Sequence, residues 1–440
     1  MTHKAGAGRL STDALARVEG EGGMHVEIVD GEVADVQLRI YEPPRFYEGF
    51  LRGRAHTEPP DITARICGIC PVAYQMSACL AVEDACGVII PPAIAELRRL
   101  LYCGEWIESH VLHIHLLHAP DFFGVDSAIE LAALDRPAVE RGLELKKIGN
   151  EVLELIGGRA IHPVNVQVGG FYRPPAPAEL RAFRPRIDRA LELAVAVVEW
   201  VADFEFPDLE TGHELVAVTD GDHYPVFGDR IVSDHGLDIE VAELFDHIEE
   251  YQVAHSSAKH ARFLSRGNYL VGPLARFALA RDRLGPAAAA AADEAGLESV
   301  CRNPFRSIVV RAVEVVHACE EALRIIDGYA PPEPASVPVP ARPGVGHGAT
   351  EAPRGLLYHR YSLDERGIIV DAEIVPPTSQ NQPTIEHDLF HFVQDNLGLG
   401  EEDLRRAAEV TIRNHDPCIS CATHFLDLTV ERRGRGEGDQ

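Results

Sequence analysis

The sequence RICGIC, residues 65–70, and the sequence DPCISCATH, residues 416–424, each carry two cysteines separated by two residues. Two thiolates at this spacing, where a loop meets a helix, can both bind one metal ion, so each pair offers half of a four-thiolate site. The four candidate ligands are Cys67, Cys70, Cys418 and Cys421.

The two cysteine pairs lie roughly 350 residues apart, whereas the cysteines of a zinc ribbon usually enclose a much shorter loop. A metal site whose ligands come from both ends of a chain is more often catalytic than a local structural cross-link. From the spacing alone, a structural zinc or iron–sulfur site and a catalytic metal site remain open alternatives.

The composition indicates a large acidic globular protein. The chain has 440 residues, a hydrophobic fraction of 46% and a formal net charge of -28. Such charge repels nucleic-acid phosphates and anionic lipid, so we expect no nucleic-acid partner. The sequence has no run of about 20 apolar residues and no signal peptide, which favours a cytoplasmic protein without a transmembrane segment. The odd number of cysteines, nine, favours thiols over a disulfide framework.

Hydrophobic periodicity predicts an α+β protein that is predominantly helical, with a large helical core and small peripheral β-sheets. Two hairpins are expected, one over 24–40 around Asp30-Gly31 and one formed by 355–361 with 367–375. The proline-rich stretch 330–343 is predicted to be an extended connector. Helices are predicted at 61–86, 92–118, 138–157, 177–204, 238–265, 305–328 and 401–413.

The residues around the cysteines resemble the large, catalytic subunit of NiFe hydrogenases. RxCGxC near the N-terminus and DPCxxCxxH at the C-terminus both match that family in full. Five further blocks match in family order and span nearly the whole chain: RVEGEG (17–22), RFYEGFLRGR (45–54), LLHAPDFFG (116–124), EAPRG (351–355) and VPPTSQNQ (375–382).

The resemblance implies a nickel–iron centre in which the iron carries CO and cyanide ligands. Cys67 and Cys418 would then be terminal ligands of nickel, and Cys70 and Cys421 would bridge nickel to iron. The implied reaction is the reversible heterolytic cleavage of H2 to protons and electrons. Soft thiolates suit such a redox metal better than carboxylates do.

Further site residues follow from the same resemblance. Glu19 matches a proton-relay glutamate, although beside Gly20 and Gly22 it would otherwise be read as a surface-turn residue. Arg354 matches an arginine over the metals, which Asp416 could orient. Thr378 and Pro377 match positions that contact the iron's ligands.

A magnesium-type site is also implied, with Glu48, the main-chain carbonyl of Gln382 and His424 as ligands. Relatives are trimmed after this histidine by a maturation endopeptidase once nickel is bound. The resemblance therefore implies one large domain over residues 1–424 and a C-terminal extension, 425–440, that is removed by cleavage between His424 and Phe425.

Two features stand apart from the family pattern. Tyr74 occupies the position where many relatives have a histidine. The sequence therefore does not decide whether this position hydrogen-bonds to the Cys70 sulfur. Four histidines on one predicted helix could bind a metal ion, but buried, hydrogen-bonded histidines at a subunit interface are favoured. They are His110, His113, His115 and His118.

The chain lacks an electron path of its own. The remaining cysteines form no iron–sulfur pattern, and Gly344, Gly346 and Gly348 are a weak match to a nucleotide-binding loop. We therefore expect a small subunit with iron–sulfur clusters, together with flavin- and NAD(P)-binding diaphorase subunits. The sequence is most similar to the cytoplasmic bidirectional, NAD(P)-linked, sulfhydrogenase-like class. An F420-non-reducing or other cytoplasmic hydrogenase, and a non-catalytic hydrogenase-like or zinc-stapled subunit, are the alternatives.

Overall fold

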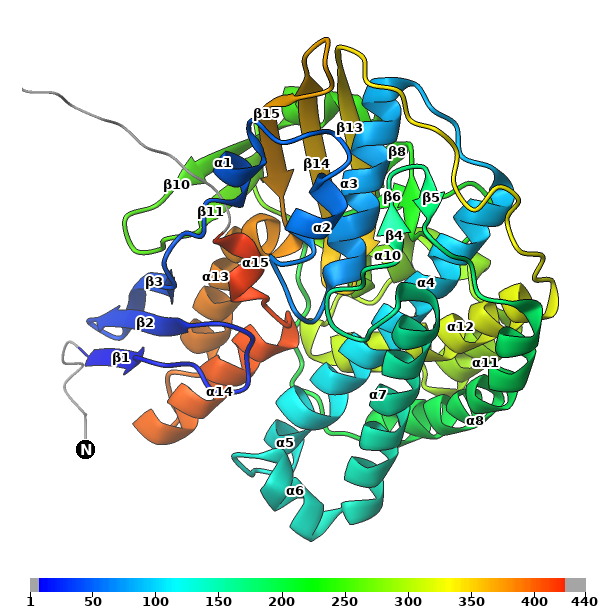
Figure 1. Ribbon diagram of the computed structural model, residues 1–440. Coiled ribbons are helices and arrows are strands. Elements are labelled where there is room, and N and C mark those ends of the chain that lie inside the picture. Colours follow the sequence, from blue (N-terminus) through cyan, green and yellow to red (C-terminus); the bar gives the residue numbers. More distant parts are fainter. Residues whose placement is uncertain (1–7, 424–440) are drawn as a thin grey trace, which may run out of the picture.

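The computed structural model describes residues 8–423 and shows a helical body with small β-sheets at its periphery, as predicted (Figure 1). The longer helices are α3 (Pro71–Cys86), α4 (Pro92–Leu112), α7 (Arg136–Gly157), α8 (Pro177–Ala202), α12 (Ser307–Asp327), α13 (Pro377–Asp395) and α14 (Glu401–Asn414). The shorter helices are α1 (Tyr47–Leu51), α2 (Pro59–Thr63), α5 (Ala119–Phe122), α6 (Ala128–Leu134), α9 (Leu244–His247), α10 (Pro273–Ala280), α11 (Pro286–Glu294) and α15 (Ile419–Ala422). One π-helical segment, η1 (His113–His118), and three single turns, η2 (Val241–Glu243), η3 (Arg281–Arg283) and η4 (Pro304–Arg306), complete the helical elements.

The strands form small, mostly antiparallel sheets. Their order is β1-β2-β3, β12-β6-β8-β9, β15-β14-β13-β7, β10-β11 and β4-β5, and β12 and β6 are the parallel neighbours. The strands are β1 (Gly8–Thr12), β2 (Gly22–Val29), β3 (Glu32–Ile40), β4 (Val166–Gln167), β5 (Gly170–Phe171), β6 (Glu214–Thr219), β7 (Phe227–Gly228), β8 (Arg230–Ser233), β9 (Asp238–Glu240), β10 (Ile248–Gln252), β11 (Lys259–Phe263), β12 (Tyr269–Val271), β13 (Gly344–Ala352), β14 (Gly355–Leu363) and β15 (Ile369–Val375).

The main core lies between α4, α7, α8 and α12, which pack side by side on the right of Figure 1. Glycines allow α4 and α7 to approach closely. A Cβ atom on Gly149 would lie 2.8 Å from the carbonyl oxygen of Gly104, and a Cβ atom on Gly104 would lie 2.9 Å from Val152. Larger side chains at these positions would separate the two helices.

Helix α3, which follows the first cysteine pair, lies across the sheet that contains β13 and β14. The glycines of β13 make this contact possible, because a Cβ atom on Gly346 would lie 2.0 Å from the carbonyl oxygen of Ala81. Gly344 and Gly348 likewise face the backbone of α3. The glycine series that weakly resembled a nucleotide-binding loop is therefore explained by strand–helix packing.

The two ends of the described chain share one hydrophobic cluster. Met24, Val26 and Leu38 of the sheet β1-β2-β3 pack against Leu389 of α13 and Ile412 of α14. This packing brings the segment before β2 next to the second cysteine pair, as the left side of Figure 1 shows.

Two helix predictions are corrected by the structure. Residues 61–86 do not form one helix: α2 ends at Thr63, and α3 begins at Pro71, whose fixed φ and missing N–H suit a helix start. Residues 238–265 contain the antiparallel pair β10 and β11 with short helical turns. The helix predicted over 92–118 is confirmed, and its last turn, after Leu112, is the π-helical segment η1.

Both predicted hairpins and the extended connector over 330–343 are confirmed. Among residues 8–423, no helix combines the length and the apolar character needed to cross a membrane.

Candidate metal centre

The four cysteines predicted to bind metal meet in the interior, and each is at most 3% exposed. Their sulfur atoms all lie within 4.8 Å of one another. The Sγ atoms of Cys67 and Cys418 are 3.5 Å apart, as are those of Cys70 and Cys421. Sulfurs bound about 2.3 Å from one tetrahedral metal would be separated by about 3.8 Å, so the four side chains are already gathered as a metal site requires.

The first cysteine pair is held by the start of α3. Cys70 precedes this helix, and Glu105 of α4 accepts hydrogen bonds from the backbone N–H groups of Val72 and Ala73, at 2.6 and 3.1 Å. A buried carboxylate at a helix N-terminus satisfies N–H groups that have no partner within the helix. Sequence reasoning missed Glu105, because nothing in its helical periodicity distinguishes it from a surface acid.

The second cysteine pair is held by two other side chains. The backbone N–H of Cys418 donates to Thr378 Oγ1 at 2.9 Å. Arg45 donates to the carbonyl oxygen of Ile66, at 2.7 Å, and to that of Ser420, so one guanidinium joins both cysteine loops. The position of Arg45 in a family block was its only sequence signal.

Glu19 lies directly against the second pair. Its backbone forms an isolated parallel bridge with Cys418, and its Oε2 accepts hydrogen bonds from the Cys418 thiol at 3.2 Å and from Ser420 N–H at 3.0 Å. Burial raises the pKa of the Glu19 carboxyl, and the charge of Cys67 raises it further. A carboxyl tuned in this way can exchange a proton with a group at the cysteine cluster.

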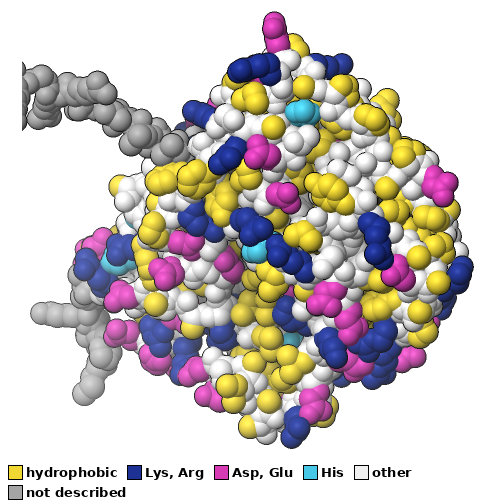
Figure 2. All heavy atoms as spheres, in the orientation of Figure 1, with side chains coloured by type: hydrophobic (Ala, Val, Ile, Leu, Met, Phe, Trp, Pro, Cys, Tyr) yellow, Lys and Arg dark blue, Asp and Glu magenta, His cyan; other side chains and the backbone are white. Residues whose placement is uncertain are grey.

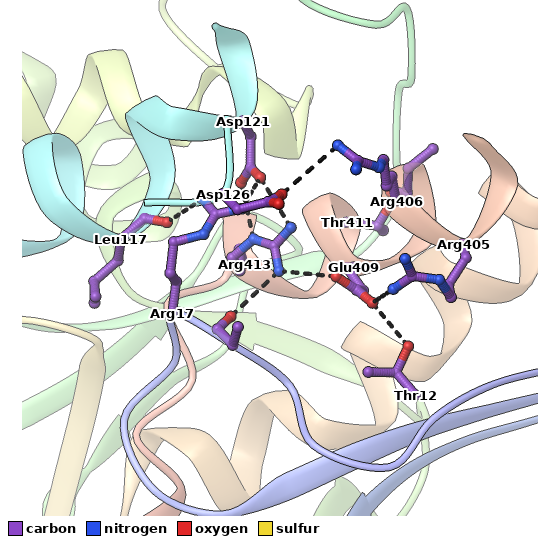
Figure 3. Close-up of polar contacts among 12 residues, drawn as sticks. Thr12, Arg17, Leu117, Asp121, Asp126, Arg405, Arg406, Glu409, Thr411 and Arg413 are labelled. Carbon is purple, nitrogen blue, oxygen red and sulfur yellow. Dashed lines mark hydrogen bonds and ion pairs between the residues drawn. The ribbon is translucent and has the colours of Figure 1, made fainter. Parts of the chain in front are cut away.

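A buried ionic network fixes the segment that carries Glu19 (Figure 3). Arg17 donates to Asp121 at 2.5 Å and to the carbonyl oxygen of Leu117 at 2.8 Å. Arg413, at the end of α14, contacts Asp121 through two nitrogens, at 2.8 and 2.9 Å, and the carbonyl oxygen of Ala16. Asp121 thus ties the segment before Glu19 to the helix that leads into the second cysteine pair.

Arg354 is also buried beside the cysteines. Its Nε donates to the carbonyl oxygen of Asp416 at 2.8 Å, and its Nη2 donates to Asp416 Oδ1 at 3.0 Å, as the sequence suggested. Although burial opposes the charge, Asp416 and then the sulfurs of Cys418 and Cys70 keep the pKa of Arg354 above its ordinary value. The guanidinium therefore stays cationic at the cluster.

The buried polar groups without a hydrogen-bond partner within residues 8–423 include two donors on the segments that contact the cysteine cluster. These two are Nη1 of Arg354 and the hydroxyl of Ser379, which follows Pro377 and Thr378 at the start of α13. Buried donors normally find an acceptor, so these two leave room for a polar group that the protein does not supply. Together with four thiols, they fit a metal centre whose own ligands accept hydrogen bonds.

The residues expected at a magnesium-type site lie in separate elements. Glu48 of α1 is buried and accepts a hydrogen bond from Ile374 N–H at 2.9 Å. The side chain of Gln382, on α13, donates to the carbonyl oxygen of Lys259 at 2.8 Å and accepts from Ser256. His424 and the cleavage position lie outside the described residues.

The four histidines at the end of α4 and in η1 are buried. His113 contacts the carbonyl oxygen of Arg413 at 2.8 Å, and His118 contacts Asn414 and Asp121. These contacts are to protein groups, and the burial of all four histidines agrees with the expectation, while their place at a subunit interface stays a prediction. Tyr74 is also buried, and burial raises the pKa of its hydroxyl well above the ordinary value, with the charges of Cys421 and Cys70 adding to the effect.

Comparison with known proteins agrees with this geometry. The sequence profile of the family described as nickel-dependent hydrogenase matches residues 45–141. The chain is 33% identical to the alpha subunit of sulfhydrogenase 2 of Pyrococcus furiosus, over 95% of this chain and 100% of that protein.

Other relatives are named as F420-non-reducing or as NAD-reducing hydrogenases. The chain is 32% identical to one subunit of the F420-non-reducing hydrogenase vhu of Methanocaldococcus jannaschii, over 88% of this chain and 99% of that protein. The beta subunit of the NAD-reducing hydrogenase HoxS of Cupriavidus necator is 29% identical over 95% of each chain.

A solved structure shares the fold. The NAD+-reducing NiFe hydrogenase in its H2-reduced state superposes with a TM-score of 0.84 at 26% identity, over 95% of this chain and 99% of that one. Since the sulfhydrogenase protein is matched from end to end and the cysteine cluster is assembled in the interior, the chain belongs to the large-subunit family of nickel-dependent hydrogenases.

Proposed function

We propose that this chain is the hydrogen-activating subunit of a NiFe hydrogenase and cleaves H2 reversibly into protons and electrons. The observation that carries the proposal is the cluster of four buried cysteine sulfurs with the Glu19 carboxylate 3.2 Å from Cys418 Sγ. Nickel, and iron with CO and cyanide ligands, would supply the redox and Lewis-acid chemistry when bound to these thiolates.

The protein groups around the cluster have distinct roles in this proposal. Glu19 takes up the proton at Oε2 and returns it in the reverse direction, because H2 cleavage needs a base close to the metals. Arg354 remains protonated and offers its free Nη1–H to polar ligands of the iron, and Thr378, next to Pro377, can offer its hydroxyl hydrogen. Asp416 acts through Arg354 as a positioning residue.

A magnesium ion bound by Glu48, the carbonyl of Gln382 and His424 is part of the same proposal. The carboxylate and carbonyl are hard oxygen ligands, which this ion prefers. The electrons must leave through a partner, since the other five cysteines, all buried thiols, form no cluster with one another in residues 8–423.

We infer that the partner is a small subunit with iron–sulfur clusters, docked near the first cysteine pair. Large apolar side chains are exposed between α7 and α8: Ile161 is 59% exposed and Tyr172, after β5, is 60% exposed. Ile161 lies beside the first cysteine pair, because a Cβ atom on Gly68 would be 3.9 Å from it. Figure 2 shows hydrophobic side chains interspersed with charged ones over this face, as in many subunit interfaces. Relatives named as NAD-reducing support diaphorase partners and NAD(P) as acceptor, while relatives named as F420-non-reducing support the alternative class.

Metal retention and hydrogen-dependent dye reduction by the purified complex test the proposal. Wild-type complex should contain nickel and reduce a low-potential dye under H2. Cys421→Ser should lose both, whereas Cys301→Ser, at a buried cysteine far from the cluster in sequence, should keep both. Zinc in place of nickel, without dye reduction, would favour a zinc-stapled subunit instead, and full activity in Cys421→Ser would contradict the assignment of the cysteine site.

A further inference from the structure

A second cluster of potential metal ligands lies between the β10–β11 hairpin and α13. It comprises His255, in the connection after β10, His260 of β11 and Glu386 of α13, whose ligand atoms all lie within 4.8 Å of one another. We propose that these three side chains bind a divalent first-row transition-metal ion, separately from the cysteine cluster.

The distances within the cluster suit one shared ion. His255 Nε2 lies 2.8 Å from Glu386 Oε1, and His260 Nε2 lies 3.5 Å from Glu386 Oε2. Two ligand atoms about 2.1 Å from a tetrahedral metal ion are separated by about 3.4 Å. Small side-chain rotations would therefore bring all three ligands into range.

His260 is the most informative member of the cluster. It is 1% exposed, and its Nδ1 has no hydrogen-bond partner within residues 8–423. Its Nε2 reaches only the Glu386 oxygen at 3.5 Å, which is longer than a good hydrogen bond. A buried imidazole without strong partners is costly, and a cation bound at the Nε2 atom that faces Glu386 would give that nitrogen a partner.

Glu386 is oriented and kept anionic for this role. The backbone N–H of Leu38 donates to its Oε1 at 2.8 Å, which fixes the carboxylate and leaves Oε2 towards His260. Although burial opposes ionisation, hydrogen bonds from His255 and His260 lower the pKa of Glu386 to about 2. The side chains of His255 and Glu386 remain 21% and 18% exposed, so an ion and its water ligand can enter.

The other histidine–carboxylate cluster of the described chain differs in a decisive way. Asp388 already uses both carboxylate oxygens, one with His213 at 2.5 Å and one with His415 at 3.0 Å. Its partners are thus satisfied as hydrogen-bonded pairs, whereas the imidazole of His260 is not.

Two imidazoles and one carboxylate favour an ion such as Zn2+, Fe2+ or Ni2+ over Mg2+. Such an ion would tie the hairpin to α13. The same hairpin already contacts Gln382 of α13 through Ser256 and the carbonyl of Lys259, so the ion would reinforce this junction. Its role would be structural, with one coordination position left to water.

Zinc retention by the intact complex tests the proposal. Purified complexes carrying wild-type chain, His260→Ala, His255→Ala or the control His223→Gln, at an exposed histidine, would be equilibrated with Zn2+ alone, desalted and analysed for metal. Wild type and His223→Gln should retain one more zinc per chain than either ligand variant. Zn2+ should raise the melting temperature of wild type and His223→Gln and leave that of the two ligand variants unchanged.

Equal zinc content in wild type and both ligand variants would overturn the proposal. If His260→Ala fails to fold because the side chain is buried, His255→Ala alone decides, since its partly exposed side chain can be shortened without opening the core. Nickel and iron are counted in the same samples, so loss of the cysteine-bound metals is distinguished from loss of this zinc.

Discussion

The Oε2 atom of Glu19 lies 3.2 Å from the Sγ atom of Cys418, although 399 positions separate the two residues in the chain. The contact exists because the N-terminal sheet packs on α13 and α14. In addition, Asp121 joins Arg17, which precedes Glu19, to Arg413, which precedes Cys418. A proton acceptor and a metal ligand are thereby held at contact distance by the fold itself.

Replacing Glu19 with Gln should remove the base while keeping the shape of the side chain. We expect hydrogen oxidation to fall by about 10²-fold or more, the usual contribution of a positioned acid–base group. Nickel and iron content should stay unchanged, because Glu19 is not among the thiol ligands. The control is Glu21→Gln, an exposed glutamate two residues away, which should keep full activity. Equal activity in both variants would refute the proton role.

Arg354→Lys should lower activity even though the charge is kept. A lysine can reach Asp416 but cannot present the planar set of donors that uses Nε, Nη2 and the free Nη1 at once. We expect a loss of about 10-fold to 10³-fold in turnover, as for removal of a preorganised donor. Arg366→Lys, at an exposed arginine, is the matched control. Unchanged turnover in Arg354→Lys would show that the planar set of guanidinium donors is not needed for the reaction.

The ionic network around Asp121 should make stability depend on pH. Although burial opposes it, His118 and Arg413 hold the pKa of Asp121 far below its ordinary value of 3.8. A depressed carboxyl pKa stabilises the fold above the unfolded-state pKa, and this stabilisation is lost as pH falls below about 3.8 towards the folded-state pKa.

Asp121→Asn should therefore reduce the free energy of unfolding at pH 7 by about 3 kcal/mol, the scale for breaking a buried ion pair. The deficit should shrink as pH is lowered below the unfolded-state pKa. Asp126→Asn removes a nearby carboxylate whose side chain is 77% exposed and should change little. Chemical denaturation at several pH values measures both, and a deficit independent of pH would contradict this electrostatic origin.

The C-terminal extension gives a prediction that needs only the mass of the chain. We propose that residues 425–440, FLDLTVERRGRGEGDQ, are removed between His424 and Phe425 after nickel is bound. Intact-mass measurement of active complex should give the mass of residues ending at His424. A retained extension in fully active protein would contradict this.

Much of the centre could be predicted because its residues lie in short motifs. The two cysteine pairs, Glu19 and Arg354 stand in local patterns, and the structure brings their side chains together. Their supports could not be predicted, since Glu105 and Asp121 act through contacts across the fold that leave no local pattern.

Helices and strands could likewise be predicted where the local sequence determines them, and not where tertiary contacts do. The predicted hairpin over 24–40 depends on a local turn and alternation, and it forms as β2 and β3. By contrast, β13 and α13 were missed: β13 is rich in glycine because it packs on α3, and the start of α13 carries buried polar residues that bond to distant strands. Tertiary contacts decided these elements, against their local propensities.

The infrared spectrum of the purified complex tests the central claim most directly. If the four cysteines bind nickel and iron as proposed, bands from metal-bound CO and cyanide should be present in wild type and absent in Cys421→Ser. A spectrum without these bands, from a wild-type complex that contains zinc and no nickel, would contradict the assignment.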